Sequence, residues 1–148
     1  MSLYRELQQR AAAGKPVRVG LIGAGKFGSM FLNQVPTMHG LEVSVIADLD
    51  PERARTSCRT VGWDAARIAR TAFVASGVEA CADPGVEVII EATGSPPAGI
   101  AHARAAIAAG KHLVMAMSKP MYWRGRSWPR RRARTGSCIR SPMATSRR

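Results

Sequence analysis

The 148-residue chain has few cysteines and no long apolar segment, and these absences exclude several classes of protein. The three cysteines, Cys58, Cys81 and Cys138, form no Cys-x-x-Cys pair. We therefore expect neither a metal site nor a disulfide framework, and a reducing cytoplasmic compartment. No segment approaches the roughly 18 consecutive apolar residues that a membrane-spanning helix requires. Residues 1–15 are polar and charged throughout, which is not the pattern of a signal peptide.

Acidic residues are missing from the end of the chain. Residues 1–116 contain twelve Lys/Arg and ten Asp/Glu, whereas residues 117–148 contain ten Lys/Arg and no Asp or Glu. Nearly all of the net charge of +12 therefore belongs to the C-terminal segment. We expect a folded domain over 1–116 and a disordered basic tail over 117–148. The alternative is a basic arm that binds nucleic acid, with Trp123 and Trp128 stacking on bases; we expect no nucleic-acid partner.

The most informative motif is a glycine-rich turn after a β-branched apolar run that begins at Val17. Its residues are Gly23, Ala24, Gly25, Lys26, Phe27 and Gly28. This is the spacing of a strand, a tight turn and a helix start that together hold a dinucleotide pyrophosphate. Gly23 permits the sharp exit from the strand, Gly25 lets backbone amides approach phosphates, and Gly28 allows close packing of the helix.

An acidic residue stands where such a nucleotide site requires one. Residues 41–46 are predicted to form a second strand, and Asp48 follows it, twenty residues after Gly28. A carboxylate at this place accepts hydrogen bonds from the adenosine ribose hydroxyls. Asp50, before Pro51, is better explained as the cap of the next helix. The joint motif predicts binding of NAD or NADP. NAD is preferred because Asp48 repels a ribose phosphate, although Arg53 and Arg55 are close enough in sequence to reduce that preference.

The remaining pattern alternates between strands and helices. Further strands are expected over 71–74, 86–91 and 111–116, and helices over 2–14, 51–61, 64–69 and 98–109. This alternation predicts an α/β fold, a Rossmann-type doubly wound parallel sheet that is incomplete at its C-terminal side. An uncovered final strand would favour association, so a homo-oligomer is possible.

Thr93, Gly94 and Ser95 follow the strand over 86–91 and should reach the same edge of the sheet as the glycine turn. They would either flank the nicotinamide half of the cofactor or serve only as the cap of the next helix. Catalytic residues are unknown, because no Ser/His/Asp, Cys/His or metal-ligand constellation can be assembled. His102 and Arg104 are expected to face solvent from the middle of a helix.

Four segments of the sequence resemble a known group of enzymes. They are residues 18–28, 46–51, 91–96 and 109–115. They look like the N-terminal half of oxidoreductases related to homoserine dehydrogenase that carry a C-terminal SAF domain, including deoxyxylulose-phosphate reductoisomerase-like enzymes. The resemblance covers residues 1 to about 116. It implies NAD(P)-dependent redox chemistry on a small-molecule substrate, with catalytic residues mostly in a following domain.

The alternative resemblance is to the Gfo/Idh/MocA sugar dehydrogenases, which share the nucleotide fold. Their signature has Glu-Lys-Pro after a Gly-Lys-His strand, and the lysine is catalytic. Here Lys119 lies seven residues after His112 instead of five, and Ser118 replaces the glutamate. We therefore interpret Lys119 as a chance match.

The composition of residues 117–148 also fits an out-of-frame translation. Back-translated codons read one base earlier give Asn-Val-Glu-Ala-Asp-Val-Leu-Ala-Gly-Pro-Phe-Leu-Ala, which fits the homoserine dehydrogenase-like group. Our hypothesis is a one-base shift near Ala116. The expected product is a domain that binds cofactor with little or no turnover.

Overall fold

The computed structural model describes residues 2–116. Five strands form one parallel sheet in the order β3-β2-β1-β4-β5. The strands are β1 (Val17–Ile22), β2 (Leu41–Ala47), β3 (Ala72–Val74), β4 (Val88–Glu91) and β5 (His112–Met115). The helices are α1 (Leu3–Ala12), α2 (Lys26–Gln34), α3 (Pro51–Thr60), α4 (Ala65–Arg70), α5 (Gly77–Ala82) and α6 (Pro96–Ala108), with a 3-10 turn η1 at Val35–Thr37. The predicted α/β fold with a parallel sheet is confirmed.

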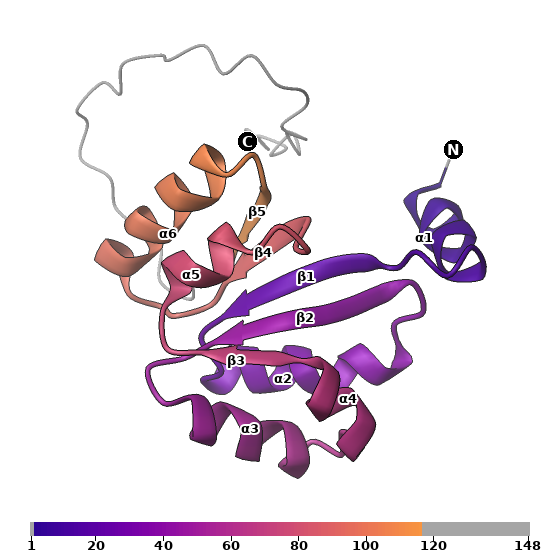
Figure 1. Ribbon diagram of the computed structural model, residues 1–148, viewed down its shortest axis with the longest axis horizontal. Coiled ribbons are helices and arrows are strands. Elements are labelled where there is room, and N and C mark those ends of the chain that lie inside the picture. Colours follow the sequence, from indigo (N-terminus) through magenta and orange to yellow (C-terminus); the bar gives the residue numbers. More distant parts are fainter. Residues whose placement is uncertain (1, 117–148) are drawn as a thin grey trace, which may run out of the picture.

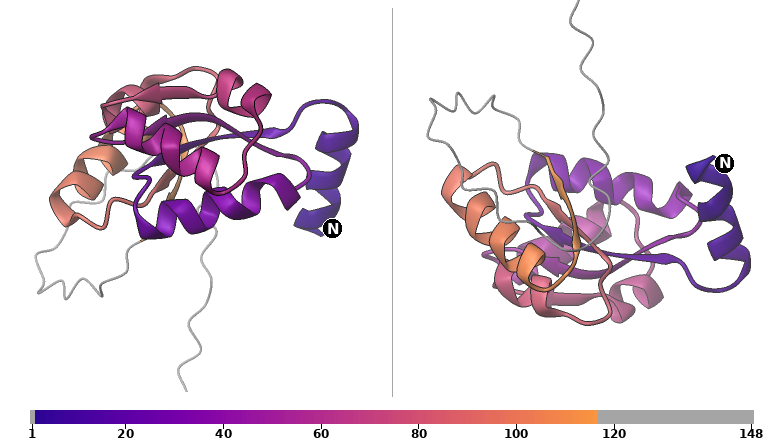
Figure 2. Two further views of the ribbon diagram at one scale, coloured as in Figure 1. Left: turned by 90° about the horizontal axis from the view of Figure 1, so that it is seen from below. Right: turned by 90° about the horizontal axis from the view of Figure 1, so that it is seen from above.

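Helices cover both faces of the sheet (Figures 1 and 2), and each face has its own apolar core. Leu21 and Ile46 belong to the core on the side of α2, α3 and α4, where Leu32 packs against them. Val45 and Ile89 belong to the opposite core, with α5 and α6. Neighbouring residues of one strand thus serve opposite cores, which is the reason that β1, β2 and β4 are apolar almost throughout.

Side-chain caps mark the starts of α3, α4 and α5. Asp50 accepts a hydrogen bond from Arg53 N at the start of α3, as expected for a cap, and Pro51 is the first helical residue. Ser2 precedes α1, but its side chain makes no capping hydrogen bond. The six-residue helix α5 was not expected from the sequence. Among residues 2–116, no helix is long and apolar enough to cross a membrane.

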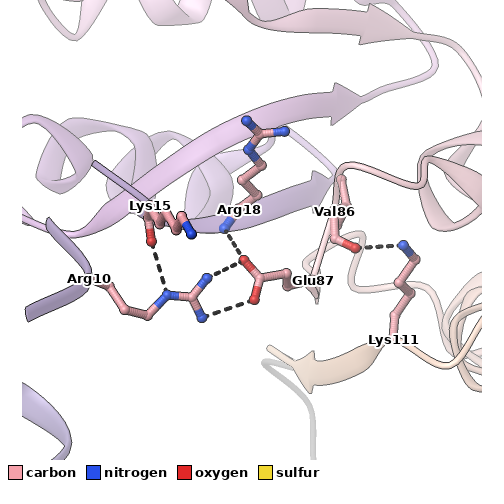
Figure 3. A network of polar contacts seen from close by, with 6 residues as sticks. All are labelled: Arg10, Lys15, Arg18, Val86, Glu87 and Lys111. Atoms are coloured by element: carbon pink, nitrogen blue, oxygen red, sulfur yellow. Dashed lines mark hydrogen bonds and ion pairs between the residues drawn. The ribbon is translucent and has the colours of Figure 1, made fainter. Parts of the chain in front are cut away.

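Helix α1 lies at the start of β1, at the opposite end of the sheet from the strand tips (Figure 1). None of its residues is fully buried; Leu7 packs against Gly40, and polar contacts join the helix to the sheet. Arg10 donates two hydrogen bonds to the Glu87 carboxylate, at 2.9 and 2.7 Å, and Arg18 N donates a third at 3.3 Å (Figure 3). The hydrogen bond from Arg10 is the main reason that the pKa of Glu87 is lowered.

Strand β5 forms one edge of the sheet, and it has exposed side chains on both of its faces. Val114 and Met115 are 52% and 41% exposed. The expectation of an uncovered last strand is therefore met for the described residues. The predicted tail, with Lys119 and the inferred frame shift, lies outside them.

Candidate functional site

A cleft of about 520 Å³ opens at the carboxyl ends of the strands. Ligands bind at this edge in open parallel sheets, because the helix N-termini and the loops converge there. The residues around the cleft are Ile22, Gly23, Gly25, Ala47, Asp48, Leu49, Arg53, Ala75, Ser76, Gly77, Ala92, Thr93, Ser95, Ala98 and His102. They come from the segments that follow β1, β2, β3 and β4, and from the first half of α6.

The glycine turn has the geometry that its spacing predicts. Gly23 adopts a φ of +95°, and a Cβ there would lie 2.9 Å from the backbone of Ala92 and Thr93. Gly28 has no room for a side chain, because a Cβ would overlap the carbonyl oxygen of Gly23. At Gly25, by contrast, a Cβ would meet nothing within 4 Å, so this part of the backbone is open at the start of α2.

Asp48 connects the end of β2 to the glycine turn. Its Oδ2 accepts a hydrogen bond from Ala24 N at 2.8 Å. Its Oδ1 accepts from Asp50 N at 3.0 Å and from Arg53 Nη2 at 2.7 Å. A carboxylate has about four lone-pair positions, so three donors leave one free. The side chain of Arg53 is 61% exposed, and this guanidinium is free to yield its place to another donor.

Asp48 is held in its ionised form. Burial is the largest single influence and by itself would raise the pKa of Asp48. The hydrogen bonds from Asp50 N, Ala24 N and Arg53, with the positive charge of Arg53, outweigh burial and lower the pKa below its ordinary value. The cleft therefore presents a negative hydrogen-bond acceptor one strand away from the open backbone of Gly25.

The segment after β4 forms a turn around a buried carboxylate. Glu91 is fully buried, and its Oε1 accepts hydrogen bonds from the backbone N–H of Thr93, at 3.2 Å, and from the Thr93 hydroxyl. The same hydroxyl oxygen accepts a hydrogen bond from Ser95 N at 3.3 Å. Thr93 and Ser95 lie at the cleft, but the Thr93 hydroxyl is occupied by the turn itself. Gly94 has a φ of +69° and does not line the cleft.

The prediction that His102 faces solvent is wrong. Its side chain is only 13% exposed, with Nδ1 3.6 Å from Glu91 Oε1. The outer edge of the ring packs against Gly77, where a Cβ would collide with Nε2. The reason is that α6 packs on α5 through small residues, so a side chain in mid-helix is covered by the neighbouring helix. Arg104 is exposed, as expected.

The structure brings Gly23, Gly25, Asp48, Thr93 and Ser95 to one cleft. Of the other predicted residues, Ala24 and Gly28 are buried beside it, while Lys26 and Phe27 are exposed on the first turn of α2. The site residues that the sequence did not predict are Glu91, His102 and Gly77. A charged residue directly after the apolar run Val88–Ile90 was the one available signal for Glu91.

The donors and acceptors present suit a phosphorylated ribonucleotide better than a metal. In residues 2–116 no three His, Cys, Asp or Glu side chains are grouped to hold a metal ion. The open backbone at Gly25 and the N-terminus of α2 suit a pyrophosphate, and Asp48 suits a ribose diol. A pyrophosphate and a ribose diol are both parts of a dinucleotide.

Comparison with known proteins agrees with this chemistry. The profile of the Gfo/Idh/MocA oxidoreductase family, an NAD-binding Rossmann fold, matches residues 17–127. An inositol 2-dehydrogenase from Acidothermus cellulolyticus is 34% identical over 101 residues, 68% of this chain and 27% of the relative. The chain thus spans about a quarter of that relative's length.

Solved structures show the same fold. An NAD binding oxidoreductase from Klebsiella pneumoniae matches 68% of this chain and 26% of its own, with a TM-score of 0.50 and 26% identity. A myo-inositol dehydrogenase from Lactobacillus casei, solved with NAD(H) and myo-inositol, matches 68% and 28%, with a TM-score of 0.55 and 22% identity.

The expected relation to homoserine dehydrogenase receives much weaker support. The homoserine dehydrogenase of S. aureus is 16% identical, with a TM-score of 0.47. The sequence segments that suggested this relation are features of the nucleotide-binding fold, which several oxidoreductase families share. The family that we weighed as the alternative is the one matched, and its match extends past the described residues to include Lys119. The chain belongs to the Gfo/Idh/MocA oxidoreductase family and contains its NAD-binding Rossmann domain.

Proposed function

We propose that this chain binds NAD(H) in the cleft, with the pyrophosphate at the N-terminus of α2. The single observation that carries the proposal is the open backbone of Gly25 one strand away from the ionised carboxylate of Asp48. Two backbone N–H groups at the start of a helix, with the partial positive charge of its dipole, attract phosphate oxygens. Asp48 then accepts the ribose hydroxyl hydrogens as Arg53 moves aside, and Thr93–Ser95 lie beside the nicotinamide half.

We further propose that NAD is preferred over NADP. A 2′-phosphate would lie close to the negative Asp48, which is buried and cannot turn away. Arg53 limits this discrimination, because its guanidinium is 2.7 Å from Asp48 Oδ1 and would pair with a phosphate there. Arg53→Ala should weaken binding of NADPH several-fold more than binding of NADH.

For a longer protein that contains this domain, the proposed reaction is oxidation of a secondary alcohol of a polyol or sugar. The alcohol carbon gives a hydride to NAD⁺ and its hydroxyl proton to a base, which leaves a ketone and NADH. This substrate class rests on the identity to an inositol 2-dehydrogenase over 101 residues. The residues described here contribute binding and orientation of the cofactor.

Titration of the 148-residue chain with NADH, followed by nicotinamide fluorescence, tests the proposal. The wild type should show saturable binding. Gly25→Val should fold normally, because Gly25 has a φ of −70° and free space around it, yet should weaken NADH binding at least tenfold by blocking the phosphates.

Gly62→Ala is the matched control. Gly62 also has free space around it, but its φ is +86° and it does not line the cleft. This variant should lose roughly 1 kcal/mol of stability and keep its NADH affinity. No saturation with the wild type, or unchanged affinity in Gly25→Val, would contradict the proposal.

A further inference from the structure

Glu91 is a buried carboxyl group whose hydrogen bonding is incomplete among the described residues. Its side chain is fully buried at the end of β4, where the neighbouring strand positions are apolar. Thr93 donates hydrogen bonds to Oε1 of Glu91, but Oε2 of Glu91 has no hydrogen-bond partner among the described residues. Burial of a carboxyl oxygen without a hydrogen-bond partner destabilises the folded state. Such a group is usually retained for a function.

His102 is the second unsatisfied group at this place. Its Nδ1 is buried, has no hydrogen-bond partner among residues 2–116, and lies 3.6 Å from Glu91 Oε1. That separation is slightly too long for a hydrogen bond, and a movement of about 0.5 Å would close it. Ligand binding commonly tightens contacts of this length in sites that are open without ligand.

The opposite edge of the imidazole packs against Gly77, and both residues line the cleft. His102 lines the cleft together with Ala98, and its ring is seated against Gly77, which has no side chain to obstruct it. Gly77 begins α5, three residues after the carboxyl end of β3, and β3 is the neighbour of β2 in the sheet. A dinucleotide with its pyrophosphate at β1 and its ribose on Asp48 at β2 extends its adenine toward β3. The imidazole therefore lies on the adenosine side of the cleft.

We propose that Glu91 is a positioning residue for the dinucleotide, acting through His102, which contacts the adenosine half, and through the Thr93 turn on the nicotinamide side. One buried carboxylate thereby connects the two halves of the cleft. Its pairing with Nδ1 fixes the ring of His102 against Gly77, where the ring forms part of the cleft wall that the ligand contacts. This inference rests on the proposed binding of NAD(H).

The test separates the two halves of the ligand. NADH is titrated directly, and ADP-ribose, which lacks nicotinamide, is measured by displacement of NADH. His102→Asn should weaken both ligands about five- to tenfold, the size expected for one lost polar contact. Thr93→Val should weaken NADH and leave ADP-ribose within about twofold, because only the turn on the nicotinamide side is altered.

Two further variants show whether Glu91 acts through His102. Glu91→Gln keeps an acceptor for Thr93 and removes the negative charge facing Nδ1, so it should resemble His102→Asn. The double variant should be no weaker than either single variant, since groups that act as one unit are not additive. Arg104→Gln, on the same helix but exposed, is the control and should bind as the wild type does.

A spectroscopic readout makes the test independent of affinity. Long-range ¹H–¹⁵N spectra of the histidine side chains identify the nitrogen that carries the proton, and His102→Asn assigns the signal. With NADH bound, Nδ1 of His102 should be protonated in the wild type, and this signature should be lost in Glu91→Gln.

The outcomes are distinguishable. If the wild type fails to bind NADH, the proposed function is wrong and this inference falls with it. If the wild type binds NADH but folded His102→Asn binds ADP-ribose as tightly, the inference alone is overturned. The inference is also overturned if the losses of NADH affinity in Glu91→Gln and His102→Asn are additive and the Nδ1 signal is unchanged in Glu91→Gln. Glu91 would then have a structural role only.

Discussion

Replacing Asp48 by Ala tests the site most directly, because this side chain holds the glycine turn and is the proposed acceptor for the ribose. Its loss leaves the buried N–H of Ala24 without its acceptor at 2.8 Å, whereas Asp50 N is partly exposed and can bond to water. One unsatisfied buried donor costs about 1–3 kcal/mol, so we expect a loss of unfolding free energy of about 2 kcal/mol. Two ribose hydroxyls also lose a charged acceptor, which predicts a loss of about 2–3 kcal/mol in binding, or about 30- to 150-fold.

Urea unfolding measures the first quantity and NADH fluorescence titration the second. Asp64→Ala is the control: it removes another capping carboxylate, which accepts a hydrogen bond from Arg67 N at 2.6 Å and does not line the cleft. It should cost about 1 kcal/mol of stability and leave the affinity unchanged. If folded Asp48→Ala binds NADH within about twofold of the wild type, the ribose contact is absent and the reasoning is refuted.

The same residue gives a pH dependence with a definite sign. The pKa of Asp48 is lowered in the folded state, so its stabilisation is complete above the unfolded pKa of about 3.9 and is lost as the pH falls through the folded value. The difference in unfolding free energy between wild type and Asp48→Asn should therefore be constant near neutral pH and narrow below about pH 4. A difference that grows with acidity would contradict the lowered pKa.

Three further results are expected. Gly28→Ala should lower the unfolding free energy by at least about 1–3 kcal/mol, measured by urea, because its Cβ would overlap Gly23 O; wild-type stability would show that α2 can shift. Burial raises the pKa of the Cys58 thiol to about 11, so in a Cys81→Ser, Cys138→Ser background Ellman's reagent should react only after unfolding. Glu87→Gln should speed amide hydrogen exchange in α1, and about 0.5 M NaCl should bring the wild type toward the variant; equal exchange rates at low salt would show that the ion pair does not hold α1.

The local signals in the sequence were sufficient for the glycine turn and Asp48. A φ of +95° at Gly23, or a helix cap at Asp50, follows from the chemistry of a few adjacent residues. Alternating strands and helices likewise predicted the parallel sheet. The choice of family was not decided by these signals, because the same turn and the same acidic residue occur in several groups of oxidoreductases.

The contribution of His102 could not be predicted in this way. Its surroundings depend on Gly77, which lies 25 residues earlier on another helix, and α5 itself is too short to give a clear periodic pattern. Glu91 was missed for a related reason: a charged residue after an apolar strand normally marks the surface, and its burial depends on how α6 packs over it. Contacts between distant segments, rather than local propensity, build this half of the site.

The position of α1 has a practical consequence for measurements on this domain. Tyr4 is 69% exposed on a helix that lies at the far end of the sheet from the cleft (Figure 1). A Tyr4→Cys variant would carry a fluorescent dye or a surface linker there, in a background where the other cysteines are replaced. The immobilised protein would keep the cleft turned toward solution, so that association and dissociation of added NADH could be recorded on a sensor chip.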